Sequence, residues 1–151
     1  MDISAEAVKE LRDQTGVSVM ECKKALTEAG GDIDKALEIL KERSLASVAK
    51  KAGRELGAGT VAAYVHNTAQ VGSMVLLSCE TDFVSKNEEF VALARDIAMH
   101  AAAMRPADTA ALLVEPFIKD STKTVADLIS AATQKFGERI EVNKLDIFSV
   151  K

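Results

Sequence analysis

The chain has 151 residues, of which 48% are apolar and 28% are charged, and its formal net charge at pH 7 is -4. This length and apolar content suffice for one ordinary domain, or for a small domain joined to a medium one. The negative charge argues against binding to nucleic acid phosphates or to an anionic membrane, since both would need an excess of Lys and Arg.

The first residues, MDISAEAVKEL, include acids where a secretory or organellar signal would carry basic residues. No apolar run approaches the roughly 20 residues that a helix needs to cross a bilayer. Cys22 and Cys79 lie far apart and in no Cys/His cluster, so they suggest neither a disulfide framework nor a zinc site. We therefore expect a soluble protein of a reducing compartment, with no metal and no cofactor.

Three short helices are predicted within residues 1–44. Ser4 can cap the first helix, and Ser18-Val19-Met20-Glu21 has the S-x-x-E pattern of a capping box for the second. Gly30-Gly31 suits the end of that helix, and Asp32 can cap a third. The apolar residues at helical spacing in the first and third helices are Val8, Leu11, Ile33, Ala36, Leu37 and Leu40.

Residues 45–58 are small and basic, which is typical of a helical or flexible linker, and residues 59–151 would form a second domain. Within it, residues 60–66 and 72–80 are rich in β-forming residues and are joined by a loop that contains Asn67-Thr68-Ala69-Gln70. They predict an antiparallel hairpin.

Two longer helices should follow the hairpin. The first is predicted from about Lys86 to Met104, with Ser85-Lys86-Asn87-Glu88 as its capping box. The second begins at a cap formed by Thr124 and ends at Gly137. The residues expected to face inward are Phe90, Leu93, Ala94, Ile97, Ala101 and Met104 in the first, and Val125, Leu128, Ile129, Ala132 and Phe136 in the second.

The final run, RIEVNKLDIFSV, alternates as a strand does, but the alternation slips. Ile140 and Val142 are out of phase with Leu145 and Ile147, and one extra residue near Asn143-Lys144 would restore a single buried face, so a β-bulge is predicted there. The expected fold class is α+β, with a three-helix bundle followed by helices packed on a small antiparallel sheet of about three strands. The edges of so small a sheet need cover.

The second helix leaves one apolar residue outside its expected inner face. Met20 should be exposed, with Lys23 and Lys24 one turn further on and Val17 in the preceding turn. This combination suits docking on a partner helix with apolar and acidic groups, although Met20 can equally be an isolated surface residue. The expected inner face consists of Val19, Cys22, Ala25, Leu26 and Ala29.

The stretch ETDFVSKNEEF places Phe83 and Val84 in a connection, where large apolar groups are uncommon. Val84 lacks a partner for a hydrophobic staple, because the residue at the expected position is Glu89. Phe83 is either an ordinary core residue or a ring exposed for a partner, and the adjacent acid, Asp82, argues against burial.

Catalytic and metal-binding alternatives have weak support. Cys79 with His66 or His100 could form a thiol and its base, but no residue orients the base and no oxyanion-hole motif accompanies it. Glu80 and Asp82 could bind a divalent ion, but two carboxylates at a strand end are more often solvated or capping groups.

Several ordered segments resemble the translation elongation factor Ts family, guanine nucleotide exchange factors for elongation factor Tu. Residues 8–43, VKELRDQTGVSVMECKKALTEAGGDIDKALEILKER, are similar to the family's N-terminal domain, a three-helix bundle of the ubiquitin-associated (UBA-like) type. VGSMVLLSCETDFVSKNEEF contains the family's TDFV signature. DIAMHAA, EPFIKD and TVADLISAATQKFGERIEV are similar to the end of its core.

The resemblance implies a set of contacts with elongation factor Tu. The TDFV loop, Thr81, Asp82, Phe83 and Val84, would contact the GTPase domain, with the Phe83 ring entering near its magnesium and nucleotide site. Val19, Met20 and Lys23 would dock on another helix of that domain. His66 matches a His of the family's core that also contacts the partner. Exchange of this kind involves no covalent chemistry, so the chain would not be an enzyme.

The chain departs from the long members of the family, which have two core subdomains and a helical hairpin. It resembles the short form, whose members pair their sheets in a homodimer, and the family implies a cytoplasmic protein of bacterial type or a mature organellar form. The alternative function is a UBA-like adaptor that binds another protein through the Met20 surface, in which the second domain only dimerises and no exchange occurs.

Overall fold

The computed structural model describes residues 2–151. The chain divides into two compact units: one contains the residues up to Ala52 together with Ser130–Gly137, and the other contains Gly53–Ile129 and Glu138–Lys151. Among the described residues, no helix combines the length and apolar character required to span a bilayer.

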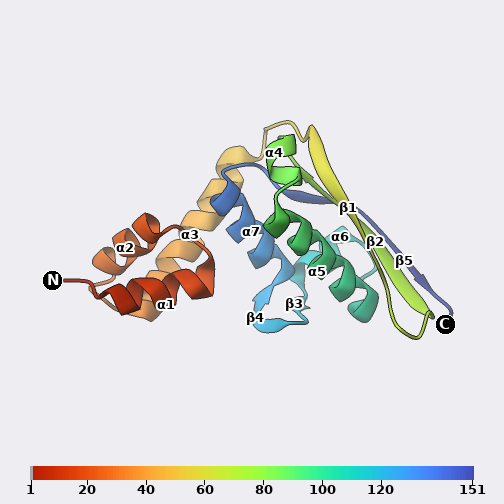
Figure 1. Ribbon diagram of the computed structural model, residues 1–151, viewed down its shortest axis with the longest axis horizontal. Coiled ribbons are helices and arrows are strands. Elements are labelled where there is room, and N and C mark those ends of the chain that lie inside the picture. Colours follow the sequence, from red (N-terminus) through yellow and green to blue (C-terminus); the bar gives the residue numbers. More distant parts are fainter. Residues whose placement is uncertain (1) are drawn as a thin grey trace. The chain divides into compact units, whose positions relative to one another are not determined.

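The first unit contains the three N-terminal helices, α1 (Ala5–Thr15), α2 (Val19–Glu28) and α3 (Ile33–Lys51), which pack against one another (Figure 1). α3 continues through residues 45–51, so this part of the predicted linker is helical. The buried core of the bundle consists of Leu11, Val17, Cys22, Ala25, Leu26, Ala36 and Leu40.

Each of these helices begins where the sequence predicts a cap. The side chains of Ser4, Ser18 and Asp32 accept the backbone N–H of the residue three positions later, which satisfies one of the unpaired donors at each helix start. After α2 the backbone takes positive φ values of 65° at Gly30 and 87° at Gly31, a conformation that glycine adopts readily.

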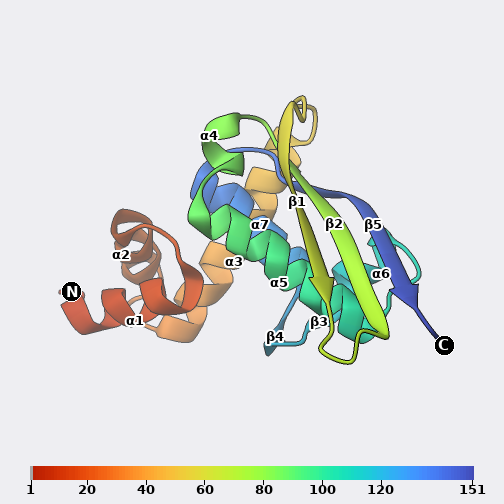
Figure 2. The same ribbon diagram turned by 45° about the vertical axis from the view of Figure 1, so that its right-hand side comes forward.

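The second unit is built on a three-stranded antiparallel sheet in the order β1 (Ala58–Val65), β2 (Val71–Cys79) and β5 (Glu141–Ser149). Helix α5 (Glu88–Met104) packs along one face of this sheet, against β1 and β2 (Figures 1 and 2). The predicted α+β class, with helices on a small antiparallel sheet, is confirmed.

The predicted bulge in the last strand is also present. Leu77 pairs with Val142 and Leu76 pairs with Lys144, so Asn143 is the extra residue. Beyond it, Leu145 and Ile147 pair with Val75 and Ser73, both buried. The bulge therefore returns the apolar residues of β5 to the face that α5 covers.

Helix α5 begins later than predicted. The cap is Asn87, whose side-chain oxygen accepts the N–H of Glu89 at 2.9 Å, and Ser85 instead ends a separate single turn, α4 (Asp82–Ser85). Four of the predicted inward residues, Phe90, Ala94, Ile97 and Ala101, are buried. Met104 is 46% exposed, because the helix ends there and too little of the chain covers its last turn.

The segment after α5 contains three short elements that the sequence pattern does not reveal: α6 (Thr109–Val114), β3 (Pro116–Phe117) and β4 (Asp120–Thr124). Buried His100 holds this segment to α5. Its Nδ1 accepts the N–H of Ile118, and its Nε2 lies 3.1 Å from the Glu115 carboxylate. The chain then enters α7 (Val125–Phe136), where Thr124 and Asp127 form a reciprocal cap.

Candidate protein-binding surfaces

The first candidate surface lies on α2. Met20 is 65% exposed, as the helical periodicity predicts, and Lys23 is also exposed. Val19 is 50% exposed, so its assignment to the inner face was wrong. It is the first residue of the helix, where fewer neighbouring side chains can cover it. Val17 was expected beside Met20 but is buried in the bundle core.

These positions leave a small apolar surface made of Val19 and Met20, with charged groups around it. Lys24 forms an ion pair with Glu21 at 3.3 Å, and Arg43 of α3 pairs with the other oxygen of Glu21. Salt bridges therefore fix part of the charged border, while the apolar side chains remain open to solvent.

The second candidate surface is the turn α4. The side chain of Phe83 is 91% exposed, so the ring is not part of the core. Asp82 is exposed beside it. Val84 follows in the same turn but is buried, and its side chain packs inward instead of joining the exposed surface. One buried and one exposed apolar residue thus stand side by side in a single helical turn.

Polar contacts from distant parts of the chain hold both ends of this turn. At its start, the Glu138 carboxylate accepts the backbone N–H groups of Glu80 and Thr81, both at 3.0 Å, and the Thr81 hydroxyl at 2.6 Å. At its end, the hydroxyl of Thr60 on β1 donates to the Ser85 carbonyl at 2.7 Å.

Of the two acids considered as ligands for a divalent ion, Glu80 already has partners within the fold. The Glu80 carboxylate accepts the backbone N–H of Arg139 and pairs with the Arg54 guanidinium at 3.4 Å, so it is used within the fold. Across residues 2–151, no three His, Cys, Asp or Glu side chains are grouped in a way that could hold a metal ion.

The environment of Cys79 does not suit a nucleophile. Burial, together with the nearby charge of Glu138, raises the pKa of the Cys79 thiol to about 11, and the thiol donates to the Thr81 carbonyl. A reactive thiol would need the opposite shift. His100, one of its two candidate bases, is occupied by Glu115 and Ile118.

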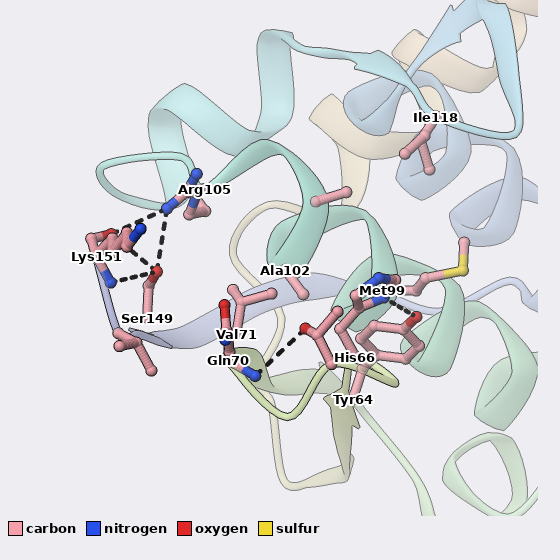
Figure 3. Close-up of a pocket in the computed structure, with 13 residues that line it drawn as sticks. Tyr64, His66, Gln70, Val71, Met99, Ala102, Arg105, Ile118, Ser149 and Lys151 are labelled. Carbon is pink, nitrogen blue, oxygen red and sulfur yellow. Dashed lines mark hydrogen bonds between the residues drawn. The ribbon is translucent and has the colours of Figure 1, made fainter.

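His66 lies at the end of β1, at the rim of a pocket of about 470 Å³ (Figure 3). Its Nδ1 is 3.1 Å from the Tyr64 hydroxyl, so this contact orients the ring and leaves Nε2 as the atom that a partner could contact. Across the pocket, Arg105 donates to the Ser149 hydroxyl and to the Lys151 carbonyl, both at 3.1 Å. The structure does not bring His66 together with Cys79 in a hydrogen bond.

A third surface was missed by the sequence reasoning, which considered only the sheet edges. On the sheet face opposite α5, the helices of this unit provide no cover (Figures 1 and 2). Its exposed apolar residues are Val61, Val65, Met74 and Phe148. The sequence of Thr60–Val65 already indicates this apolar face, because its apolar residues occupy both alternating sets of positions and therefore both faces of the strand.

These observations define an α+β molecule with exposed apolar side chains on helix α2, on the turn α4 and on one face of its sheet. Comparison with known proteins then identifies its family. The family model described as Elongation factor TS matches residues 80–151. An elongation factor Ts from Desulforamulus reducens is 40% identical over 188 aligned residues, which include 95% of this chain and 87% of the relative. The chain belongs to the elongation factor Ts family of translation factors.

Two further relatives show how the family varies in length. An elongation factor Ts from Leptospira biflexa is 38% identical over 195 residues, with 99% of this chain and 98% of the relative covered. That alignment is longer than this chain, so the relative contains a stretch that this chain lacks. An elongation factor Ts from Clostridium botulinum is 45% identical over 148 residues, which is 98% of this chain but 48% of the relative.

Proposed function

We propose that this chain is a guanine nucleotide exchange factor, which binds elongation factor Tu in its GDP-bound state and accelerates the release of GDP. The observation that carries the proposal is the Phe83 ring, 91% exposed on a turn held at both ends. Exposing a phenylalanine in this way is unfavourable unless a partner buries it, and family membership indicates that partner.

The proposed mechanism is a coupling of two binding equilibria. A factor that accelerates GDP release must bind the nucleotide-free GTPase more tightly than the GDP-bound one, and GDP must weaken the factor by the same ratio. Burying the Phe83 ring near the phosphate and magnesium site would contribute about 2–3 kcal/mol, which corresponds to roughly a hundredfold acceleration. No bond to this chain forms or breaks, so the activity is not enzymatic.

The remaining surfaces have proposed roles in the same complex. Val19, Met20 and Lys23 would dock on a second helix of the GTPase domain, and Thr81 and Asp82 would flank the inserted ring. His66 would contact the partner at the opposite end of β1. Since Val84 is buried, we assign it to support of the turn. Such a factor acts where ribosomes translate, which we propose is the bacterial cytoplasm.

We also propose that two copies of the chain associate through the uncovered sheet face. The face is apolar along β1 and β2, and on β5 it carries Lys144 and Asp146 at alternate positions of the same side. A twofold axis can place opposite charges of this kind against each other, so the face is suited to a second copy of itself.

The function is tested by stopped-flow release of a fluorescent GDP from elongation factor Tu. We expect the wild-type chain to accelerate release and Phe83→Ala to lose about a hundredfold of that acceleration. Val114→Ala is the matched control, because Val114 is also an exposed apolar residue, at 73%, but lies on α6. A folded Phe83→Ala variant with wild-type activity would contradict the proposal. The adaptor function predicts instead that the Met20 surface suffices for binding and that Phe83→Ala has no effect.

A further inference from the structure

We propose that Glu138 is a positioning residue: its carboxylate fixes the start of α4 and so holds the Phe83 ring in the orientation that a partner receives. The inference rests on the proposed function, because it assigns a role within the same surface. Glu138 itself need not touch the partner.

The contacts of Glu138 are made to the two residues that immediately precede α4. Thr81 is the N-cap of α4, but its side chain makes no capping hydrogen bond within the turn. Its hydroxyl instead donates to Glu138 at 2.6 Å, while the backbone N–H groups of Glu80 and Thr81 donate to the other oxygen of the same carboxylate. One side chain from the segment before β5 therefore satisfies three donors at the base of the turn.

The turn needs such external contacts because it is too short to be stable alone. α4 contains four residues, and an isolated helical turn is unfavourable in water. Its own backbone bonds are few: Ser85 N–H to Thr81 O at 3.2 Å, Lys86 N–H to Asp82 O at 3.1 Å and Asn87 N–H to Val84 O at 3.0 Å. Phe83 contributes little packing, since almost all of its side chain is exposed. The conformation of the turn therefore depends on Glu138 at one end and on Thr60 and buried Val84 at the other.

The end of β2 and the segment before β5 also have a contact that is independent of the Glu138 side chain. The Glu80 carboxylate accepts the backbone N–H of Arg139, so the end of β2 is already joined to the segment before β5 without the Glu138 side chain. Removing that side chain should leave this junction intact and release Thr81. Because an ordered turn loses less conformational freedom on binding than a mobile one, release should weaken binding of the partner.

The test uses the full-length chain with Glu138→Ala and Glu138→Gln, and with Glu141→Ala as the matched control. Glu141 carries the same charge nearby and pairs with Arg139, but has no hydrogen bond to the turn. The first readout is amide hydrogen exchange, which does not depend on any partner. We expect the Thr81 amide and the amides of residues 85–86 to exchange at least about tenfold faster in Glu138→Ala, with the amides of β2 and α5 unchanged.

The second readout is GDP release from elongation factor Tu, measured over a range of factor concentrations. Glu138→Ala should raise the half-saturating concentration about five- to twentyfold and leave the maximal rate nearly unchanged. It should have no further effect when Phe83 is already alanine, because it acts through that ring. Glu138→Gln keeps one acceptor oxygen, so its Thr81 amide should retain much of the wild-type protection from hydrogen exchange.

Unchanged hydrogen exchange at Thr81 in Glu138→Ala would overturn the proposal. It would also be overturned if Glu138→Ala raised the half-saturating concentration by the same factor whether residue 83 is Phe or Ala. If Glu138→Ala does not fold, Thr81→Val removes only the hydroxyl contact and tests the same prediction. Failure of the wild-type chain to accelerate GDP release would refute the proposed function, whereas the hydrogen-exchange result would still decide whether Glu138 holds the turn.

Discussion

The fold changes the acidity of one thiol in a way that can be measured. Burial raises the pKa of Cys79 from 9.0 to about 11, with a further contribution from the charge of Glu138. Because the folded state holds this proton more tightly than the unfolded state does, the protonated thiol contributes stability below about pH 9. That contribution is lost as the pH rises through about 11.

We expect the free energy of unfolding to fall between pH 9 and pH 11, and Cys79→Ala to remove part of this slope. Urea unfolding at several pH values measures it. Iodoacetamide should label Cys79 slowly at pH 7.5 in the folded chain, because little thiolate is present and the side chain is fully buried. Rapid labelling at that pH without unfolding would show that the thiol is accessible and ionised.

At the level of single residues, helical periodicity predicted that Met20 is exposed, and the adjacent acid, Asp82, raised the same possibility for Phe83. Both follow from local sequence. The errors have a different origin. Val19 and Met104 lie at helix ends, where periodicity gives the direction of a side chain but not whether another element covers it. Glu138 could not be found, because its three contacts join residues far apart in sequence.

Among the elements, β5 is the clearest case in which a sequence pattern requires a particular structure: its slipped alternation of apolar residues requires the bulge at Asn143. Because side chains alternate along a strand, removal of one residue would transfer all those beyond it to the other face. Deletion of Asn143 should therefore turn Leu145 and Ile147 toward solvent and Lys144 and Asp146 toward α5.

We expect this deletion to lower the free energy of unfolding by about 2–4 kcal/mol, as measured by urea denaturation. Asn143→Ala is the control: the residue is exposed, so this change should stay within about 0.5 kcal/mol of wild type. If the deletion variant were as stable as the wild type, β5 would not need the bulge to bury its apolar residues.

Elements of regular length were predictable from caps and periodicity, whereas the short ones were not. α4, α6, β3 and β4 have two to six residues each, which is too short for a periodic pattern to be visible. They depend on tertiary contacts instead, such as those of buried His100 with Glu115 and Ile118. Ser85 is a further example: its neighbours resemble a capping box, but the tertiary contacts of α4 place the helix cap at Asn87.

At the scale of the whole molecule, the main feature to explain is the apolar sheet face that no helix of its unit covers. A three-stranded sheet with α5 on one side has a second face that is in contact with solvent. On that face, β2 residues Gly72 and Met74 lie beside Val65 and Ala63 of β1, and Gly72 also lies beside Phe148 of β5. Exposed apolar side chains that are continuous across three strands are typical of an interface.

Phe148 offers the most direct test of the proposed dimer, since it is 74% exposed on this face. In a twofold dimer each protomer would contribute one such ring. Phe148→Lys would then remove two buried rings, or about 4–6 kcal/mol, and weaken association by more than about a thousandfold. Sedimentation equilibrium should show a dimer for the wild-type chain and a monomer for this variant. The melting temperature of the wild type alone should rise with protein concentration.

Val114→Lys is the matched control, because it places the same charge on an exposed apolar residue that lies on α6, outside the sheet. It should remain a dimer. If the wild type is a monomer at all accessible concentrations, the sheet face is not a self-association surface. If Phe148→Lys and Val114→Lys dissociate equally, the change in net charge governs association and the sheet face has no special role. Pairing through β1, β2 and β5 is supported only if Phe148→Lys is a monomer while Val114→Lys remains a dimer.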